Sequence, residues 1–149
     1  MTAKFYAMKK YIVLLLTCTL LSACGSDDYN NSNRYLPNYN FSIDLDMSLA
    51  LYSPLQFPAN PIRVNQAGIG INGIIVMNTG SGYVAYEATC PNQPVTSCSS
   101  LTLEGINVKC NCDDVVYSLF TGLPETDVRY SLKPYRVQVL GPNAIRVYN

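Results

Sequence analysis

The sequence is 149 residues long, enough for one domain with its own core and too short for two domains of ordinary size. Hydrophobic residues make up 48% of it and charged residues 13%, which is typical of a folded chain and not of a disordered one. Ten basic residues balance ten acidic ones, and no run of basic residues occurs, so nucleic-acid binding is not expected.

The first 23 residues have the pattern of an export signal. Lys9 and Lys10 precede an apolar run over residues 11–21, and small residues follow before Cys24. A basic start, a short apolar run and a small-residue cleavage site predict a secretory signal peptide over residues 1–23, too short to span a bilayer. Its removal takes three lysines away and leaves seven basic and ten acidic residues, a net charge of about −3.

Leu21-Ser22-Ala23-Cys24 resembles the lipobox of bacterial lipoproteins, in which the cysteine is acylated and becomes the first residue. The resemblance implies a lipid on Cys24 and a lipid-anchored protein of the cell envelope, at the outer membrane. The alternative is an ordinary signal peptide that leaves Cys24 as a free thiol. Asp27 and Asp28 either resemble the surface-export signal of some Bacteroidetes lipoproteins or only solvate the chain, so a periplasmic and a surface-exposed location both stay open.

Residues 24–40 are expected to form a flexible tether between the lipid and the domain. They are polar, rich in Asn and Ser, and show no periodicity. Tyr29, Tyr35 and Tyr39 are expected to lie against the domain or at the membrane interface. The folded domain is then expected over residues 41–149.

Beyond the tether, turn signals recur every 8 to 12 residues, which is typical of an all-β domain. Residues 41–49 alternate apolar and polar side chains and predict a strand with one buried face. Three hairpins are predicted by pairs of β-rich runs around turn residues, and residues 115–120 predict a further strand. The hairpins cover residues 73–88, 100–110 and 135–149, the second turning near Glu104-Gly105 and the third at residues 141–143.

Gly68, Gly70 and Gly73 match the spacing of a dinucleotide-binding glycine motif. That motif works only between a strand and a helix, because the pyrophosphate lies at the helix N-terminus. A β-branched run follows here instead, so no nucleotide is expected. The glycines are expected to form turns or to allow close approach of the chain.

Four cysteines are the main chemical feature of the mature chain. Cys90, Cys98, Cys110 and Cys112 lie within 23 positions, and an even set in an exported protein favours disulfides over free thiols. Cysteines at positions i and i+2 of a strand are too far apart to bond, so Cys110 with Cys112 is disfavoured. Two pairings that join the first two cysteines to the last two stay open.

The two boxes, Cys90-Pro91-Asn92 and Cys110-Asn111-Cys112-Asp113, resemble those of the Rieske family, Cys-x-His and Cys-x-Cys-His. The resemblance extends over about residues 68–149, through "YSLFTGLP" and the closing hairpin. It implies an all-β fold, a Rieske-like antiparallel sandwich or small barrel of stacked hairpins with two cysteine-bearing loops. It also implies a [2Fe–2S] cluster with ligands at positions 90, 92, 110 and 113, and a disulfide between Cys98 and Cys112.

Both histidines that the family uses as ligands are missing, since Asn92 and Asp113 occupy their positions. A Rieske site needs two imidazoles on one iron, and an Asn amide is a poor iron ligand. No cofactor is therefore expected, and a second disulfide, Cys90–Cys110, is expected where the family has its two thiolate ligands. Three alternatives stay open: an iron or [2Fe–2S] site with unusual ligation by Cys90, Cys110 and Asp113, a redox-active dithiol at Cys110 and Cys112, and a four-cysteine zinc site.

Catalysis is not expected, because the sequence contains no histidine for a Ser-His-Asp or Cys-His arrangement. The expected function is a structural or binding module anchored in the envelope. The alternatives are an electron-transfer protein that keeps a cluster, and a thiol-disulfide oxidoreductase. An envelope protein partner is expected to dock at the tip of the cysteine loops, which is formed by Asn92, Gln93, Pro94, Asp113 and Asp114.

Overall fold

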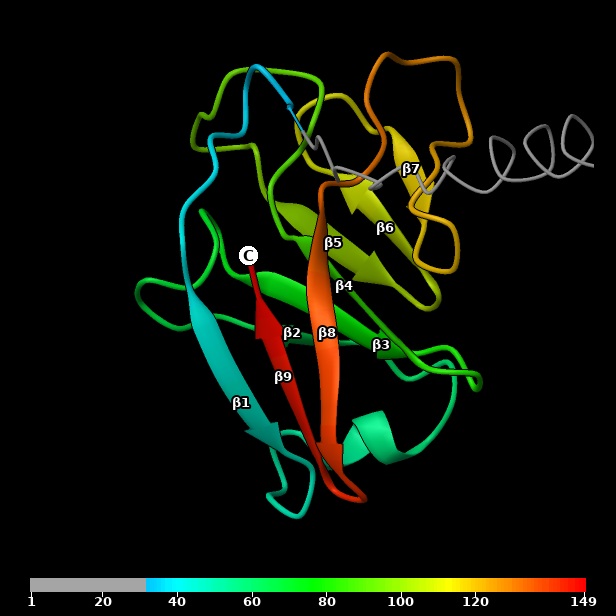
Figure 1. The fold of residues 1–149 in the computed structure, drawn as a ribbon. Coiled ribbons are helices and arrows are strands. Elements are labelled where there is room, and N and C mark those ends of the chain that lie inside the picture. Colours follow the sequence, from blue (N-terminus) through cyan, green and yellow to red (C-terminus); the bar gives the residue numbers. More distant parts are fainter. Residues whose placement is uncertain (1–31) are drawn as a thin grey trace, which may run out of the picture. The chain divides into compact units, whose positions relative to one another are not determined.

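The computed structural model describes residues 32–149, and the predicted signal peptide and Cys24 lie outside them. Nine strands and one short 3-10 helix make up this part of the chain (Figure 1). Their bounds are β1 Ser42–Asp46, η1 Ser53–Gln56, β2 Ile62–Val64, β3 Ile74–Asn78, β4 Tyr83–Glu87, β5 Leu101–Glu104, β6 Asn107–Cys110, β7 Val116–Ser118, β8 Pro134–Gly141 and β9 Ala144–Tyr148.

The strands form two antiparallel sheets. The larger has the order β1-β9-β8-β4-β3-β2 and the smaller has the order β5-β6-β7 (Figure 1). The chain enters the small sheet after β4 and returns to the large sheet at β8, beside β4. The small sheet is thus an insertion between two neighbouring strands of the large one. The first cysteine box lies in the connection from β4 to β5, and the second begins at the end of β6.

Strand β3 connects the two halves of the core, since four of its five residues are fully buried. Ile74 and Val76 point into a core enclosed by the large sheet, while Ile75 and Met77 point into a second core against the small sheet. Successive side chains of a strand point to opposite faces, so a continuous apolar run is what a strand between two cores requires. The second core also contains Cys90 and Cys110.

The prediction of an all-β domain built from antiparallel hairpins with two cysteine-bearing loops is confirmed. Strand β1 shows the predicted alternation of buried and exposed residues, and the three hairpins are β3–β4, β5–β6 and β8–β9. The sequence reasoning missed β2 and η1. Strand β2 has three residues, too few to show alternation, and η1 begins at Ser53-Pro54, where proline suits a first helical turn.

The N-terminal part of the described chain lies on the domain, which differs from the tether expected up to residue 40. Leu36 is 1% exposed, and the buried Lys133 donates from Nζ to the carbonyl oxygens of Leu36 (3.0 Å) and Pro37 (2.7 Å). Asn33 Nδ2 donates to the carbonyl of Pro91 at 2.7 Å. Composition alone suggested a free segment, but one buried leucine and one buried lysine hold it in place.

Within residues 32–149, no helix is long and apolar enough to cross a membrane.

Candidate functional site

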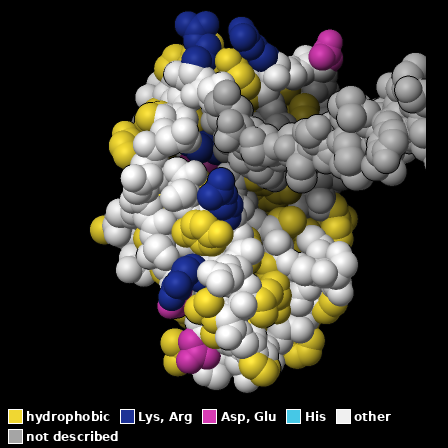
Figure 2. Space-filling model, in the orientation of Figure 1, with side chains coloured by type: hydrophobic (Ala, Val, Ile, Leu, Met, Phe, Trp, Pro, Cys, Tyr) yellow, Lys and Arg dark blue, Asp and Glu magenta, His cyan; other side chains and the backbone are white. Residues whose placement is uncertain are grey.

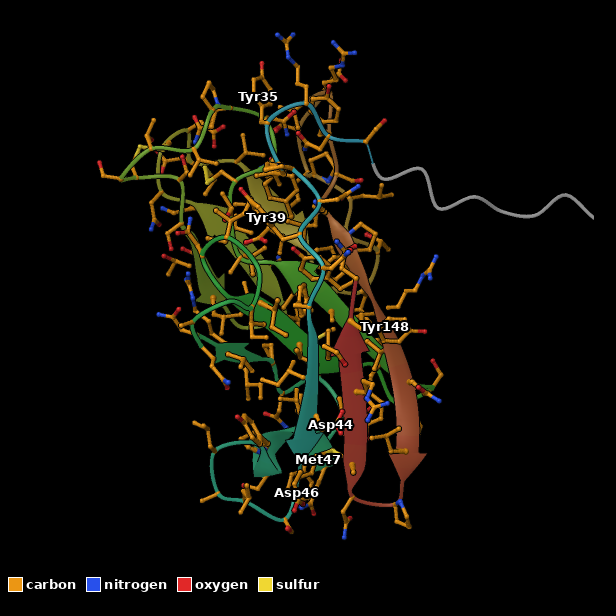
Figure 3. The ribbon with its side chains drawn as sticks, turned by 60° about the vertical axis from the view of Figure 1, so that its left-hand side comes forward. Tyr35, Tyr39, Asp44, Asp46, Met47 and Tyr148 are labelled. Carbon is orange, nitrogen blue, oxygen red and sulfur yellow. A yellow bond between two sulfur atoms is a disulfide. The ribbon has the colours of Figure 1, made fainter. Side chains whose placement is uncertain are left out.

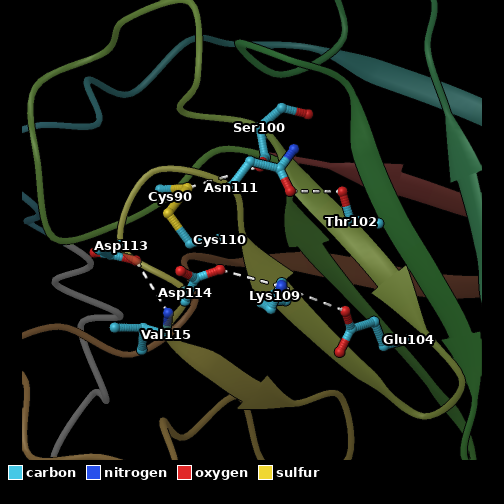
Figure 4. Close-up of polar contacts among 10 residues, drawn as sticks. All are labelled: Cys90, Ser100, Thr102, Glu104, Lys109, Cys110, Asn111, Asp113, Asp114 and Val115. Atoms are coloured by element: carbon cyan, nitrogen blue, oxygen red, sulfur yellow. Dashed lines mark hydrogen bonds and ion pairs between the residues drawn. A yellow bond between two sulfur atoms is a disulfide. The ribbon is translucent and has the colours of Figure 1, made fainter.

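The first cysteine loop and the second meet at a buried disulfide. Cys90 follows β4, Cys110 ends β6, and the two are bonded with their Cα atoms 5.5 Å apart (Figure 4). Both are fully buried, beside Leu101 and Tyr117 in the second core. Backbone pairing brings them together, because Thr89 bridges Ser100 and Leu101 pairs with Cys110. The expected Cys90–Cys110 bond is present in the structure.

A second disulfide, Cys98–Cys112, lies nearer the surface, with Cα atoms 5.1 Å apart. Cys98 is exposed and Cys112 is half-buried. Two hydroxyls lie beside it: Thr96 Oγ1 is 3.3 Å from Cys98 Sγ, and Ser99 Oγ is 3.8 Å from Cys112 Sγ. A disulfide sulfur carries no proton, so the hydroxyls are the only possible donors in these contacts. The two crosslinks therefore differ in access to solvent.

Asn92, at the first position where the family has a histidine, is committed to holding two other parts of the chain. Its Nδ2 donates to Tyr117 Oη (2.9 Å) and to the Tyr130 carbonyl (2.7 Å), and its Oδ1 accepts from the Tyr130 N–H (2.8 Å). Burial raises the pKa of Tyr117 above its ordinary value, against the effect of the Asn92 hydrogen bond. The side chain thus connects the first cysteine loop to β7 and to the loop before β8.

Asp113 and Asp114 lie in the turn between β6 and β7, directly after Cys112, and the Asp114 N–H donates to the Cys110 carbonyl at 3.0 Å. Asp113 Oδ1 accepts the backbone N–H of Val115 at 3.1 Å, in a local turn of the Asx type (Figure 4). Asp114 has a φ of +60° and pairs with Lys109 at 3.1 Å, which raises the pKa of that lysine. The Asp113 carboxylate thus closes a local turn, while the Asp114 carboxylate makes an ion pair.

The residues at the four family ligand positions do not fit a [2Fe–2S] cluster as they are arranged. The sulfur atoms of Cys90 and Cys110 are bonded to each other, and a thiolate is needed on iron. The Asn92 amide makes three hydrogen bonds within the protein, and the Asp113 carboxylate is exposed and faces its own turn. No group of three or more potential metal ligands occurs in the described part of the chain.

The other predicted tip residues, Gln93 and Pro94, cover the cysteines. Gln93 Nε2 lies 3.3 Å from Cys110 Sγ, and the Pro94 carbonyl accepts from Ser99 Oγ at 3.1 Å. Gln93 is half-buried, whereas Pro94 and the following Val95 are exposed. Thr96 and Ser97 are exposed as well, so the first loop presents both apolar and hydroxyl-bearing side chains to solvent.

The turn that contains Gly68, Gly70 and Gly73 binds the carboxylate of Glu87. The backbone N–H groups of Ile71 and Asn72, in the turn formed by residues 68–73, donate to Glu87 at 2.8 and 3.2 Å. All three glycines have positive φ, and a Cβ at Gly70 would lie 2.5 Å from the Gly73 carbonyl oxygen and 2.9 Å from Glu87 Oε2. Successive backbone N–H groups of this kind form an anion-binding nest, which here is filled by the protein's own side chain.

Sequence reasoning missed the buried polar residues that surround this nest. Glu87 also accepts from Thr89 Oγ1 and Tyr135 Oη, each at 2.7 Å, and is fully buried. Burial, followed by the nearby Glu87 carboxylate, raises the pKa of Tyr135, and burial lowers the pKa of Lys133. An acidic residue inside the apolar run "YVAYEA" was the signal that could have revealed the network, because buried charges require partners.

No family model matches the sequence, and no curated protein matches it. Solved structures are similar to it. One is a chain in the complex of reduced oxygenase and oxidized ferredoxin of carbazole 1,9a-dioxygenase (26% identity, 71% of this chain and 93% of that chain, TM-score 0.47). Another is the ferredoxin of carbazole 1,9a-dioxygenase from Nocardioides aromaticivorans (16% identity, 74% and 97%, TM-score 0.44). A third is a candidate NADH-dependent nitrite reductase small subunit from Mycobacterium tuberculosis (17% identity, 75% and 97%, TM-score 0.44).

Proposed function

We propose that this protein is a cluster-free domain of Rieske-like architecture that serves as a binding module of the cell envelope. One observation carries the proposal: the two sulfur atoms at the family's thiolate positions are bonded to each other inside the second core. Breaking this bond to bind iron would leave an Asn amide that is already used in three hydrogen bonds. The crosslink therefore replaces the stabilisation that a metal centre would provide.

A binding role is favoured over catalysis because the polar side chains near the cysteines are committed to the fold. Asn92 holds Tyr117 and Tyr130, Asp113 closes a turn, and Asp114 pairs with Lys109. The sequence offers no imidazole for proton transfer near neutral pH. The exposed Pro94 and Val95, with Thr96 and Ser97 beside them, are then the surface that a partner protein would contact, and the contact would combine apolar and hydroxyl groups.

In the same proposal, the domain is held at the envelope membrane by a lipid on Cys24, with residues 1–23 removed as a signal peptide. The lipobox-like sequence supports this. The first core residue in the sequence is Leu36 and the last is Val147, so a chain that begins at Gly25 keeps every described core residue.

The test is an intact mass of the chain from Gly25 onward, purified without oxygen from an envelope fraction. We expect the native and the denatured, non-reduced masses to agree and to lie four hydrogens below the all-thiol value, one pair for each disulfide. A native mass with added iron and sulfide that is lost on denaturation would overturn the proposal in favour of electron transfer. Colour that bleaches on reduction would independently overturn it in the same way.

Thiol-disulfide exchange is a second candidate, favoured by the exposure of Cys98 and the hydroxyl beside it. An incoming thiolate of a reduced protein would attack Cys98 Sγ, the bond to Cys112 would break, and Cys112 would leave as a thiolate. Hydrogen-bond donors stabilise such a thiolate. A reduction potential well below that of known exchange catalysts would identify this disulfide as structural and remove the candidate.

A further inference from the structure

We infer that the end of the domain that carries the cysteine loops has a built-in patch for an anionic membrane surface, formed by Arg34, Tyr35, Arg129 and Tyr130. The inference rests on the proposed lipid anchor, because it concerns the surface that this anchor brings close to lipid. It assigns the patch to acidic phospholipid headgroups at the membrane on which the protein is anchored.

The four residues form one continuous cluster from two distant parts of the chain. The rings of Tyr35 and Tyr130 meet edge to face with their centroids 6.1 Å apart. Arg34 lies over the Tyr35 ring and Arg129 over the Tyr130 ring, each with its Cζ 5.2 Å from the centroid. Both guanidinium groups are exposed and both rings are half-buried. The outer surface of the cluster is thus cationic, with aromatic rings directly beneath.

Neither arginine has an acidic partner among the described residues, where the ion pairs involve only Lys109 and Arg146. The loop that carries Arg129 also carries two exposed acidic residues: Asp127, and Glu125, whose Oε1 accepts from Asn107 Nδ2 at 3.2 Å. Figure 2 shows basic side chains gathered at this end of the molecule with one acidic side chain near them. A positive end on a mature chain of net negative charge points to an anionic partner.

The composition of the patch fits a lipid headgroup layer. Guanidinium groups bind phosphate through two parallel hydrogen bonds, which ammonium groups cannot do. Tyrosine rings favour the boundary between water and hydrocarbon because one side is apolar and the hydroxyl is polar. A free anion would need only the arginines, whereas arginines and tyrosines together fit a surface.

The backbone beside the patch is held by the buried Lys133 and the half-buried Asn92. Lys133 fixes the carbonyls of Leu36 and Pro37, just after Tyr35. Asn92 fixes the backbone N–H and carbonyl of Tyr130. Because the backbone on both sides is already ordered, binding a membrane costs little further conformational entropy. Asn92 is therefore also a positioning residue for this surface.

The position of the patch matches the point where the chain leads toward the lipid. Tyr35 lies at one end of the molecule, whereas Asp46 and Met47 lie at the other (Figure 3). Cys24 and Ser32 are eight positions apart, which is a reach of at most about 29 Å even when fully extended. A lipid on Cys24 would hold this end of the domain within that distance of the bilayer.

The test uses the mature chain with the substitution Cys24→Ser, which removes the lipid and leaves binding to the patch alone. Its affinity is measured by co-sedimentation with vesicles of phosphatidylglycerol and phosphatidylethanolamine, and with phosphatidylcholine vesicles. We expect binding to the anionic vesicles that is weakened about fivefold by each of Arg34→Gln and Arg129→Gln, and by added salt. The matched control Arg136→Gln removes an exposed arginine of β8 and should bind as the parent does.

A second measurement gives the orientation. The sequence contains no tryptophan, so Tyr130→Trp and Phe57→Trp each introduce a single reporter, the second one just after η1. Anionic vesicles should shift the emission of the first to the blue and leave the second unchanged. Equal binding of all variants, equal binding to neutral vesicles, or a shift at position 57 alone would overturn the patch. None of these outcomes touches the proposed disulfide module, which the intact mass of the chain from Gly25 decides separately, or the acylation of Cys24, which the mass of a chain that keeps Cys24 decides.

Discussion

Asn92 and Tyr130 are joined by two reciprocal hydrogen bonds across 38 positions of the chain. Asn92 Nδ2 donates to the Tyr130 carbonyl at 2.7 Å, and the Tyr130 N–H donates to Asn92 Oδ1 at 2.8 Å. The Asn side chain thereby mimics one step of a β-ladder between the first cysteine loop and the loop before β8. An imidazole has one donor and one acceptor at fixed positions and cannot reproduce all three bonds of this amide.

Asn92→Ala is expected to lower the free energy of unfolding by roughly 2–4 kcal/mol, because three hydrogen bonds are lost and the Tyr130 backbone is left partly unpaired. Urea unfolding measures the change. Asn143→Ala, which alters an exposed side chain in the β8–β9 turn, is the control and should have little effect. Equal midpoints for the two variants would contradict a structural role for Asn92.

Gly70→Ala is expected to destabilise the domain by about 2 kcal/mol or more. Position 70 has a φ of +63°, and the added methyl would meet the Gly73 carbonyl oxygen and Glu87 Oε2. At Gly141 the φ is ordinary and the space is open, so Gly141→Ala should be neutral or slightly stabilising. Thermal unfolding of the two variants side by side gives the comparison. If Gly70→Ala unfolds at the same temperature as the parent, the turn around Glu87 can adapt to the added methyl group.

The two disulfides are expected to be reduced in a fixed order. A phosphine reductant under native conditions should open Cys98–Cys112 first, because Cys98 is exposed while Cys90 and Cys110 are fully buried. Alkylation followed by peptide mapping identifies the thiols released, and the denatured protein, in which access is equal, is the control. Loss of either crosslink should cost about 3 kcal/mol on the chain-entropy model. Early labelling of Cys90 would show that the second core opens readily.

Tyr135→Phe is expected to flatten the alkaline part of the stability profile. The pKa of Tyr135 is raised in the folded state, so its contribution is complete below the unfolded pKa of about 10 and is lost as the pH rises further. Lys133 acts in the opposite direction, since burial lowers its pKa and stability rises as it releases its proton. Tyr117, whose pKa is also raised, stays in the variant, so the loss should be weaker but not abolished.

The measurement is the free energy of unfolding between about pH 8 and pH 11 for the parent and the variant. The variant should also be less stable near neutral pH, because Glu87 loses the hydrogen bond from Tyr135 Oη. An unchanged alkaline slope would show that this hydroxyl does not govern the loss of stability.

Elements whose signal is local were predictable from the sequence. The alternation in β1 and the paired β-rich runs around 79–82 and 141–143 correspond to observed strands and turns. The short strand β2 was missed, because three residues between Pro61 and Asn65 show no periodicity and are ordered by pairing with β3. The burial of Leu36 within the predicted tether left no local signal, because its carbonyl is held by Lys133, which lies 97 positions away.

The sequence by itself showed that histidine chemistry is not available to this chain. Without histidine there is no imidazole for iron or for proton transfer, and four cysteines behind a predicted export signal favour crosslinks whatever the fold. Only the tertiary structure decided what the remaining residues do. It placed Cys90 against Cys110 in a core, filled the glycine nest with Glu87, used Lys133 and Asn92 to hold distant segments, and brought Arg34 and Arg129 to one end. The physical reason is that hydrogen bonds and burial depend on distances in space, and residues about 15 to 100 positions apart leave no periodic trace in the sequence.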